Sequence, residues 1–319
     1  MTAELGLVYA SRDDDYAGGV NDRLVRSIKV IQRLARKLDI SVDMVVVDWN
    51  SPPGRGLVNF CAKENLSGVR IIRVSEDLAR AMGASQARPF LEYPAKNVGL
   101  HYVDAEQVLV LNPDIVMSRD LLRSCVARPH LHDSFLRADR TDFRWLGRYR
   151  KVALRRHVRH GETQLEPITL APRPITHRMG STAPLKREKE QDGFIIGLPG
   201  GVRGHFLLGM HTNAAGDFIC TSRRNWLRAG GFAQDRWLTG MGDAVMVARL
   251  TALNLRQVIK PGAGLWHEDH VSDPSRGGTW SETLWPHFLQ ELVSAASTPP
   301  TPMNRQIFDH AEQLECRLD

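Results

Sequence analysis

The chain has 319 residues, of which 42% are hydrophobic and 24% are charged, and its formal net charge is +6. This composition is ordinary for a globular protein, and the length suits one large domain or two fused lobes. No apolar run approaches the roughly 18 residues that cross a bilayer. The mild positive charge fits phosphate-bearing ligands, an anionic membrane surface or no charged partner at all.

The N-terminal residues and the cysteines indicate the cellular compartment that we expect for the protein. The first residues, MTAELGLVYASRDDD, turn acidic where a signal peptide would still be apolar, so we expect no secretion. The cysteines are widely spaced and form no CxxC pair, which is typical of reduced thiols and not of a disulfide or zinc framework. We therefore expect a cytoplasmic protein with free thiols at Cys61, Cys125, Cys220 and Cys316.

Strands and helices alternate over the first part of the chain. Strands are expected at 5–10, 42–47 and 69–74, and residues 21–38 have apolar side chains at helical spacing. This alternation predicts an α/β fold with a doubly wound, mostly parallel sheet flanked by helices. No GxGxxG follows the first strand and no GxxxxGK[ST] occurs, which disfavours an ordinary dinucleotide site and a P-loop.

The most informative motif ends the next strand. Residues 108–111 are a continuous apolar run, typical of a strand buried on both faces, after a helix that we expect to open at Lys96. Pro113 lacks an N–H, so the strand stops at Asn112-Pro113-Asp114, at the sheet edge where α/β ligands bind. Its two oxygen ligands suit Mg²⁺ or Mn²⁺ carrying phosphates, although the same residues are also ordinary turn formers.

The character of the chain changes from residue 144. The run RWLGRYRKVALRRHVRHG contains no acid, and a Pro-rich run of low hydrophobicity follows it. We expect a mobile insertion or lid here, and not a packed element. The basic run fits a grip on phosphates, peripheral contact with a membrane surface, or a solvated linker. Its aromatic residues are too few for a single-strand stacking platform, and we expect no nucleic-acid partner.

A second ordered lobe is expected from residue 206 to about residue 270. Asp217 precedes a short apolar strand, Ser222 caps the next helix, and Gly242-Asp243 opens another. The chain ends with a helix over 279–292 and a short amphipathic helix. We therefore expect four segments: a first α/β half at 1–143, the insertion at 144–205, a second lobe at 206–275 and a helical tail at 276–319.

Seven segments, in this order and spacing, together resemble the GT-A glycosyltransferases, particularly the inverting, family 2-like ones. They cover most of the chain: LVYASRDDD, VVVDWNSPP, AKNVGL, VLVLNPDI, GDFICTSRRNWLRAGGF, MGDAVMVARL and WHEDH. The resemblance implies a GT-A fold and transfer of a sugar from a nucleoside diphosphate sugar to a hydroxyl of a glycan, a lipid-linked sugar or a small molecule. Inverting and retaining enzymes share this fold, so the anomeric outcome stays open.

The resemblance also implies roles for residues. Asp114 and His267 would hold Mn²⁺ or Mg²⁺, which neutralises the leaving diphosphate. Asp243 would be the general base on the acceptor hydroxyl, and Asp217 is the competing base. The nucleotide sugar would contact Ser11, Arg12, Asp14, Asp48, Asn50, Lys96 and Asn112.

Two departures from the family pattern keep other hypotheses open. Asn112 stands where the first acid of D-x-D is expected, and Gly242 replaces the first acid of the Glu-Asp motif. A non-catalytic nucleotide-sugar-binding protein would tolerate both changes. A sugar-1-phosphate nucleotidyltransferase has a similar sheet but usually a Gly-rich basic loop after its first strand, whereas this loop is acidic. An RNA-binding protein would need the basic run as its functional surface.

Overall fold

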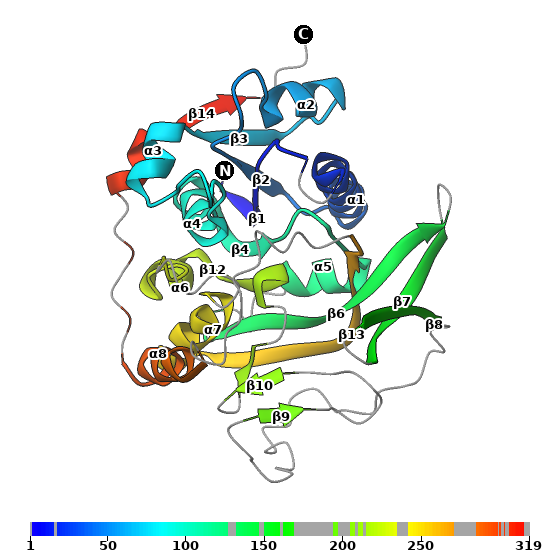
Figure 1. The fold of residues 1–319 in the computed structure, drawn as a ribbon, viewed down its shortest axis with the longest axis vertical. Helices are drawn as coiled ribbons and strands as arrows, with labels where there is room; N and C mark the ends of the chain where they lie inside the picture. The colour runs from blue at the N-terminus through cyan, green and yellow to red at the C-terminus, as the bar shows by residue number, and fades with distance from the viewer. Residues whose placement is uncertain are drawn as a thin grey trace.

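Figure 1 shows the fold as a computed structural model, in which one central sheet runs through both halves of the chain. The nine strands of its main path are ordered β14-β3-β2-β1-β4-β12-β6-β13-β5. The structure describes residues 2–15, 18–126, 132–146, 150–159, 162–168, 194–196, 205–207, 210–212, 215–234, 242–270, 285–298, 300, 303 and 306–315.

The N-terminal half is built on four parallel strands, β3 (Val69–Val74), β2 (Val42–Trp49), β1 (Ala3–Ser11) and β4 (Ala105–Leu111). The expected helix is α1 (Val20–Leu38), and shorter helices α2 (Leu57–Lys63) and α3 (Glu76–Ala81) follow β2 and β3. Ser75 caps α3 by accepting a hydrogen bond from the Leu78 amide. The expected α/β fold, with a mostly parallel sheet flanked by helices, is confirmed in this half.

Both faces of these strands are buried, as the apolar runs predict. In β1, Leu7 packs on the side of α1, whereas Val8 packs on the side of α4 (Glu92–Tyr102). Successive side chains of a strand point to opposite faces, so one strand supplies both cores. Gly99 of α4 lies so close to Val8 that an added Cβ would collide with it. The close approach of α4 to β1 therefore depends on a glycine.

The second half continues the same sheet through antiparallel and parallel pairs. β12 (Phe218–Ser222) lies antiparallel to β4 and to β6 (Ser134–Leu146), and β13 (Arg256–Glu268) runs parallel to β6 and antiparallel to β5 (Ile115–Met117). A 3₁₀ turn, η2 (Ala215–Asp217), precedes β12. Helices of this half are α5 (Arg119–Val126), α6 (Arg223–Arg228), α7 (Gly242–Ala252) and α8 (Trp285–Ser297).

The expected start of one helix is wrong by a full turn. α4 begins at Glu92 and not at Lys96, with Leu91 as its N-cap. Pro94 is tolerated because it occupies the first turn, where backbone N–H groups have no intrahelical acceptor anyway. The consequence is that Lys96 lies in the second turn, inside the protein, instead of at an exposed helix start.

Parts of the expected insertion at 144–205 are described, and they form strands where irregular structure was expected, whereas the expected mobility stays a prediction. Strands β7 (Arg150–Arg159) and β8 (Glu162–Ile168) pair antiparallel beside β6, where no packed element was expected. Ladder hydrogen bonds come from the backbone, so a basic sequence can still form them. In the same segment the structure describes β9 (Phe194–Ile196) and β10 (His205–Leu207), which form a separate small sheet with β11 (Met210–His211). Apart from the end of β6 at 144–146, the remainder of 144–205 lies outside the described residues.

The C-terminal tail returns to the N-terminal half. Instead of a short amphipathic helix, it has a 3₁₀ turn, η4 (Gln306–His310), and a strand, β14 (Glu312–Glu315), antiparallel to β3. The Tyr102 hydroxyl lies 3.0 and 2.9 Å from the carbonyl oxygens of Phe308 and Ala311, so its one hydrogen is shared between them, which holds the turn against α4. The first part of the expected helix at 279–292 lies outside the described residues, and α8 begins at Trp285.

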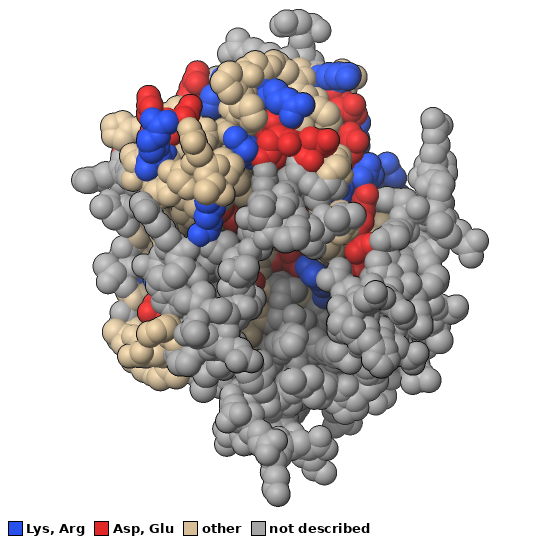
Figure 2. Space-filling view, viewed as in Figure 1, with Lys and Arg blue, Asp and Glu red and all other residues tan. Residues whose placement is uncertain are grey.

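Figure 2 shows acidic side chains gathered over the N-terminal half, between groups of Lys and Arg side chains. The described part of this face therefore carries mixed charge and not a single basic patch. Cys61, Cys125 and Cys220 are buried, and Cys316 lies outside the described residues. Among the helices that the structure describes, none is long and apolar enough to cross a membrane.

Candidate functional site

Strand pairing brings the polar ends of several strands to one edge of the sheet. Ser11 is opposite Asp48 in the β1–β2 ladder, and Leu111, the last residue of β4, is opposite both Tyr9 and Phe218. Asn112 and Asp217 follow or precede these paired residues directly, so they meet at the same edge. The carboxyl ends of parallel strands are the expected ligand edge of such a sheet.

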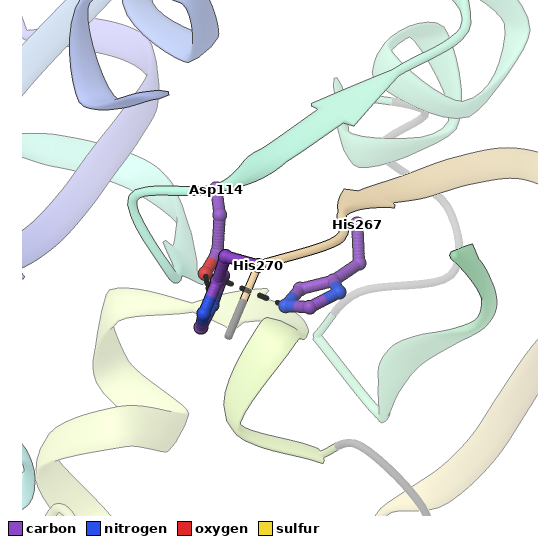
Figure 3. Close-up of side chains that lie close together, drawn as sticks. All are labelled: Asp114, His267 and His270. Carbon is purple, nitrogen blue, oxygen red and sulfur yellow. Dashed lines mark hydrogen bonds and ion pairs between the residues drawn. The ribbon is translucent and has the colours of Figure 1, made fainter. Parts of the chain in front are cut away.

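Three side chains converge between the turn that joins β4 to β5 and the end of β13 (Figure 3). The Nε2 atoms of His267 and His270 lie 3.4 and 3.0 Å from Oδ2 of Asp114. The potential ligand atoms of the three residues all lie within 4.8 Å of one another. β13 places His267 opposite Ile115, the residue after Asp114, which explains why residues so distant in sequence meet. Together they form a candidate metal site.

The charges of this triad stabilise each other. Burial acts to raise the pKa of Asp114, but His267 and His270 outweigh it and hold that pKa well below its usual range. Burial likewise acts to lower the pKa of His267, but Asp114 and Asp142 outweigh it and raise this pKa to about 10. Asp114 therefore stays ionised, ready to bind a cation.

The donor set fits a divalent metal. Oδ1 of Asp114 is buried and has no hydrogen-bond partner among the described residues, so one carboxylate oxygen is left for a ligand. The Nδ1–H of His267 donates a hydrogen bond to Oδ1 of Asp142 at 2.9 Å, which leaves its Nε2 facing Asp114. A carboxylate that holds the outer nitrogen of a ligating histidine is typical of metal sites. A cation would take the place of the His267 proton, since only neutral imidazole binds metals.

A chain of polar contacts leads away from the triad. Arg140 lies 3.5 Å from Asp142 and 2.6 Å from Oδ2 of Asp217. The other oxygen of Asp217 accepts a 2.8 Å hydrogen bond from Asn112. Both oxygens of Asp217 therefore have partners, and its side chain is only 4% exposed. Through these contacts Asp217 links η2 to β6 and to the turn after β4. Because both of its oxygens are occupied, the contacts count against Asp217 as the competing base.

Lys96 stands at the far end of this chain and is fully buried. Its ammonium donates to Oε1 of Glu92, to Oδ1 of Asn112 at 2.7 Å and to the carbonyl of Gly216 at 2.9 Å. Three acceptors match the three N–H groups of an ammonium. The expected contact between Lys96 and a nucleotide would require breaking one of these bonds.

Asp243 lies at the start of α7, beside the same glycine. Its Oδ2 accepts a 2.7 Å hydrogen bond from the Gly216 amide, and its Oδ1 accepts one from the Ala244 amide. Burial raises the pKa of Asp243 to about 6, and Glu92 adds to the rise, while the amides and Lys96 oppose it. A carboxylate with this pKa can accept a proton near neutral pH.

The remaining expected residues gather beside the ends of β1 and β2. Arg12 donates to the Asn50 carbonyl at 2.7 Å and to Asp14 at 2.5 Å. Ser11 is buried, and its hydroxyl has no hydrogen-bond partner among the described residues. Asp48 is fully buried and accepts from Ser51 and from the Leu57 amide, and burial raises its pKa. A nucleobase would have to share the Asp48 carboxylate with these two donors.

Four residues of this site were missed in the sequence. His270 ends the WHEDH segment but was not assigned as a ligand, and Glu92, Arg140 and Asp142 were not singled out. His270 could have been found, since it lies three residues after His267 where the chain leaves a strand. The other three occur in a helix start and in a long strand, where single charged residues give no spacing signal.

No family model matches the chain, and no curated protein matches it. Among solved structures, the chain is similar to S. aureus TarS 1-349 in complex with UDP-GlcNAc, with a TM-score of 0.49 and 10% sequence identity. The match covers 91% of this chain and 66% of that chain. The present chain thus spans just under two thirds of its neighbour, and the likeness concerns the fold alone.

Proposed function

We propose that this protein is a glycosyltransferase that moves a sugar from a nucleoside diphosphate sugar to an acceptor hydroxyl, with a divalent metal. The observation that carries the proposal is the pairing of two unlike sites at one sheet edge. The triad of Asp114, His267 and His270 suits a cation, and the Asp243 carboxylate, with its pKa raised to about 6, suits a proton. Such transfer needs both kinds of group.

The triad supports the donor side of the proposal. Asp114, His267 and His270 would hold the metal, with Asn112 beside them, and a bound divalent metal would neutralise charge on the leaving diphosphate. Mn²⁺ accepts imidazole and carboxylate ligands together, whereas Mg²⁺ prefers oxygen ligands, so two histidines favour Mn²⁺. Ser11 and Arg12 lie at the neighbouring strand end, where the nucleoside would sit.

Asp243 supports the acceptor side. In its ionised form it accepts the proton of the attacking hydroxyl, which increases the nucleophilicity of the oxygen as it bonds to the sugar carbon. The helix start tends to lower its pKa, and burial raises it. An acceptor that excludes water would raise the pKa further, so we expect Asp243 to work as a base mainly when acceptor is bound.

The test is a screen of nucleotide sugars with Mn²⁺. UDP-, GDP- and dTDP-sugars would be incubated with the protein and a mixture of hydroxyl acceptors, with parallel samples in EDTA. We expect release of nucleoside diphosphate from at least one donor, and its loss in EDTA. Donor binding without release in any acceptor mixture would favour the non-catalytic binding protein. Absence of both release and thermal stabilisation by every donor would contradict the proposal.

A further inference from the structure

Three charged side chains of the candidate acceptor side meet around one glycine. A Cβ built on Gly216 would lie 3.4 Å from Oδ2 of Asp243, 3.4 Å from Oε1 of Glu92 and 3.5 Å from Nζ of Lys96. The amide of Gly216 donates to Asp243, and its carbonyl accepts from Lys96. The backbone of this one residue of η2 is therefore hydrogen-bonded to α7 through its amide and to α4 through its carbonyl.

Lys96 is enclosed by groups that favour its charge and its position. Besides its three hydrogen-bond acceptors, its ammonium lies 5.9 Å from the ring centre of Tyr93 and 5.6 Å from that of Phe232. These are distances at which a cation is attracted to an aromatic face. The Glu92 carboxylate, by contrast, is about one third exposed, since its side chain keeps 34% of its accessible surface. Lys96 is thus the fixed member of the pair and Glu92 the accessible one.

We propose that Lys96 and Glu92 are positioning residues that act in opposite directions on Asp243 through the Gly216 turn. This inference rests on the proposed function, in which Asp243 is the base. Lys96 ties α4, the Asn112 turn and η2 into one unit, and its positive charge favours the ionised form of Asp243. Glu92 places a second negative charge beside Asp243 and favours its protonated form.

The described groups that face Asp243 can be named from each neighbouring element. Glu92, Lys96 and the Tyr93 hydroxyl face it from α4, the Gly216 amide from η2 and the Ala244 amide from its own helix. Among these described groups, only Lys96 and Glu92 carry full charges of opposite sign. Removing one or the other should therefore move the titration of Asp243 in opposite directions, which loss of packing alone would not do.

The test is a carbon-13 titration of aspartate carboxyl groups, in which the Asp243 resonance is the one absent from Asp243→Asn. Wild type should titrate with a pKa of about 6. Glu92→Gln should lower this pKa and Lys96→Met should raise it, each by about one unit, the lower end of the range for a nearby charge. Lys29→Met is the matched control, because it breaks the exposed 3.0 Å Lys29–Glu64 pair, and it should leave the titration unchanged.

The outcomes separate this inference from the proposed function. Opposite shifts in the two variants support it, and an unchanged Glu92→Gln titration, or shifts of the same sign, would overturn it. If Lys96→Met does not fold, by circular dichroism, the decision rests on Glu92→Gln alone. The titration needs neither donor nor acceptor, so it stays readable if no transfer is found. Where transfer is found, the pH at half-maximal kcat should move with the same signs.

Discussion

Asp114 and Asp243 are two partly buried aspartates at one edge of one sheet, and their surroundings shift their pKa values in opposite directions. Burial acts to raise the pKa of both. At Asp114 two histidines outweigh burial and hold the pKa well below its usual range, whereas at Asp243 burial prevails and raises the pKa to about 6. The comparison teaches that neighbours, more than residue type, decide which carboxylate binds a cation and which accepts a proton.

The largest expected effect comes from removing the carboxylate of the candidate metal site. Asp114→Ala deletes the only carboxylate of the triad and leaves two histidines facing each other. We expect Mn²⁺ affinity to fall by more than about 100-fold, beyond the usual loss from an outer-sphere partner, as measured by Mn²⁺ paramagnetic resonance. Metal-dependent nucleoside diphosphate binding and turnover should be lost with it.

The matched control is Asp120→Ala, which removes an acid of α5 whose side chain is 87% exposed. It should bind Mn²⁺ as wild type does. Activity that persists in both EDTA and Asp114→Ala would show that the metal assignment is wrong.

The next effect removes the proton acceptor. Asp243→Asn keeps the size of the side chain but cannot take a proton, so the transfer rate should fall by roughly 100-fold or more. Donor binding, measured by calorimetry, should stay near that of wild type. Near-normal transfer in Asp243→Asn, with loss in Asp217→Asn instead, would move the role to Asp217. Loss of donor binding would make Asp243 structural or metal-linked.

A smaller effect is expected from removing the carboxylate that contacts His267 from outside the candidate metal site. Asp142 contacts Nδ1 of His267 at 2.9 Å and so fixes which nitrogen faces Asp114. Asp142→Asn should weaken Mn²⁺ binding by about 10-fold to 100-fold, the usual cost of losing such a partner. The titration of Asp243 should not change in this variant. Unaltered Mn²⁺ affinity would show that the Asp142 contact does not orient the ligand.

A further effect concerns the stability of the fold and its dependence on pH at Asp243. Because its pKa is raised to about 6 in the folded chain, the folded state holds this proton more tightly than the unfolded state, whose aspartate pKa is about 3.9. The free energy of unfolding should therefore fall as pH rises from about 4 to 6, by roughly 1.4 kcal/mol for each unit of pKa difference. Denaturant titrations of wild type and Asp243→Asn should diverge in this window. Parallel curves would contradict a raised pKa.

Much of the sheet could be predicted because its strands are buried on both faces. The β3 strand was predicted at its observed bounds, and the end of β4 follows from Pro113. The position of Asp243 at a helix start was also correct. The start of α4 could not be read in this way, since Pro94 in the first turn resembles a helix break.

The site was less predictable than the fold. Asn112 and Asp217 are 105 residues apart in sequence, and their contact depends on the antiparallel register of β12 against β4. Lys96 has the type and position of a ligand-binding residue in the resemblance, yet the structure buries it. Patterns in a single sequence indicate which face or edge of an element a residue occupies. They do not indicate its hydrogen-bond partners, which come from distant segments.

The central claim is that the cation site and the proton acceptor are separate, and one binding experiment tests that separation. Wild type, Asp114→Ala and Asp243→Asn would be titrated with nucleoside diphosphate in Mn²⁺ by calorimetry, using the nucleotide of the best donor in the screen. We predict that Asp243→Asn binds it as tightly as wild type, whereas Asp114→Ala binds it no better in Mn²⁺ than in EDTA. Equal binding by all three proteins, with or without Mn²⁺, would contradict the account.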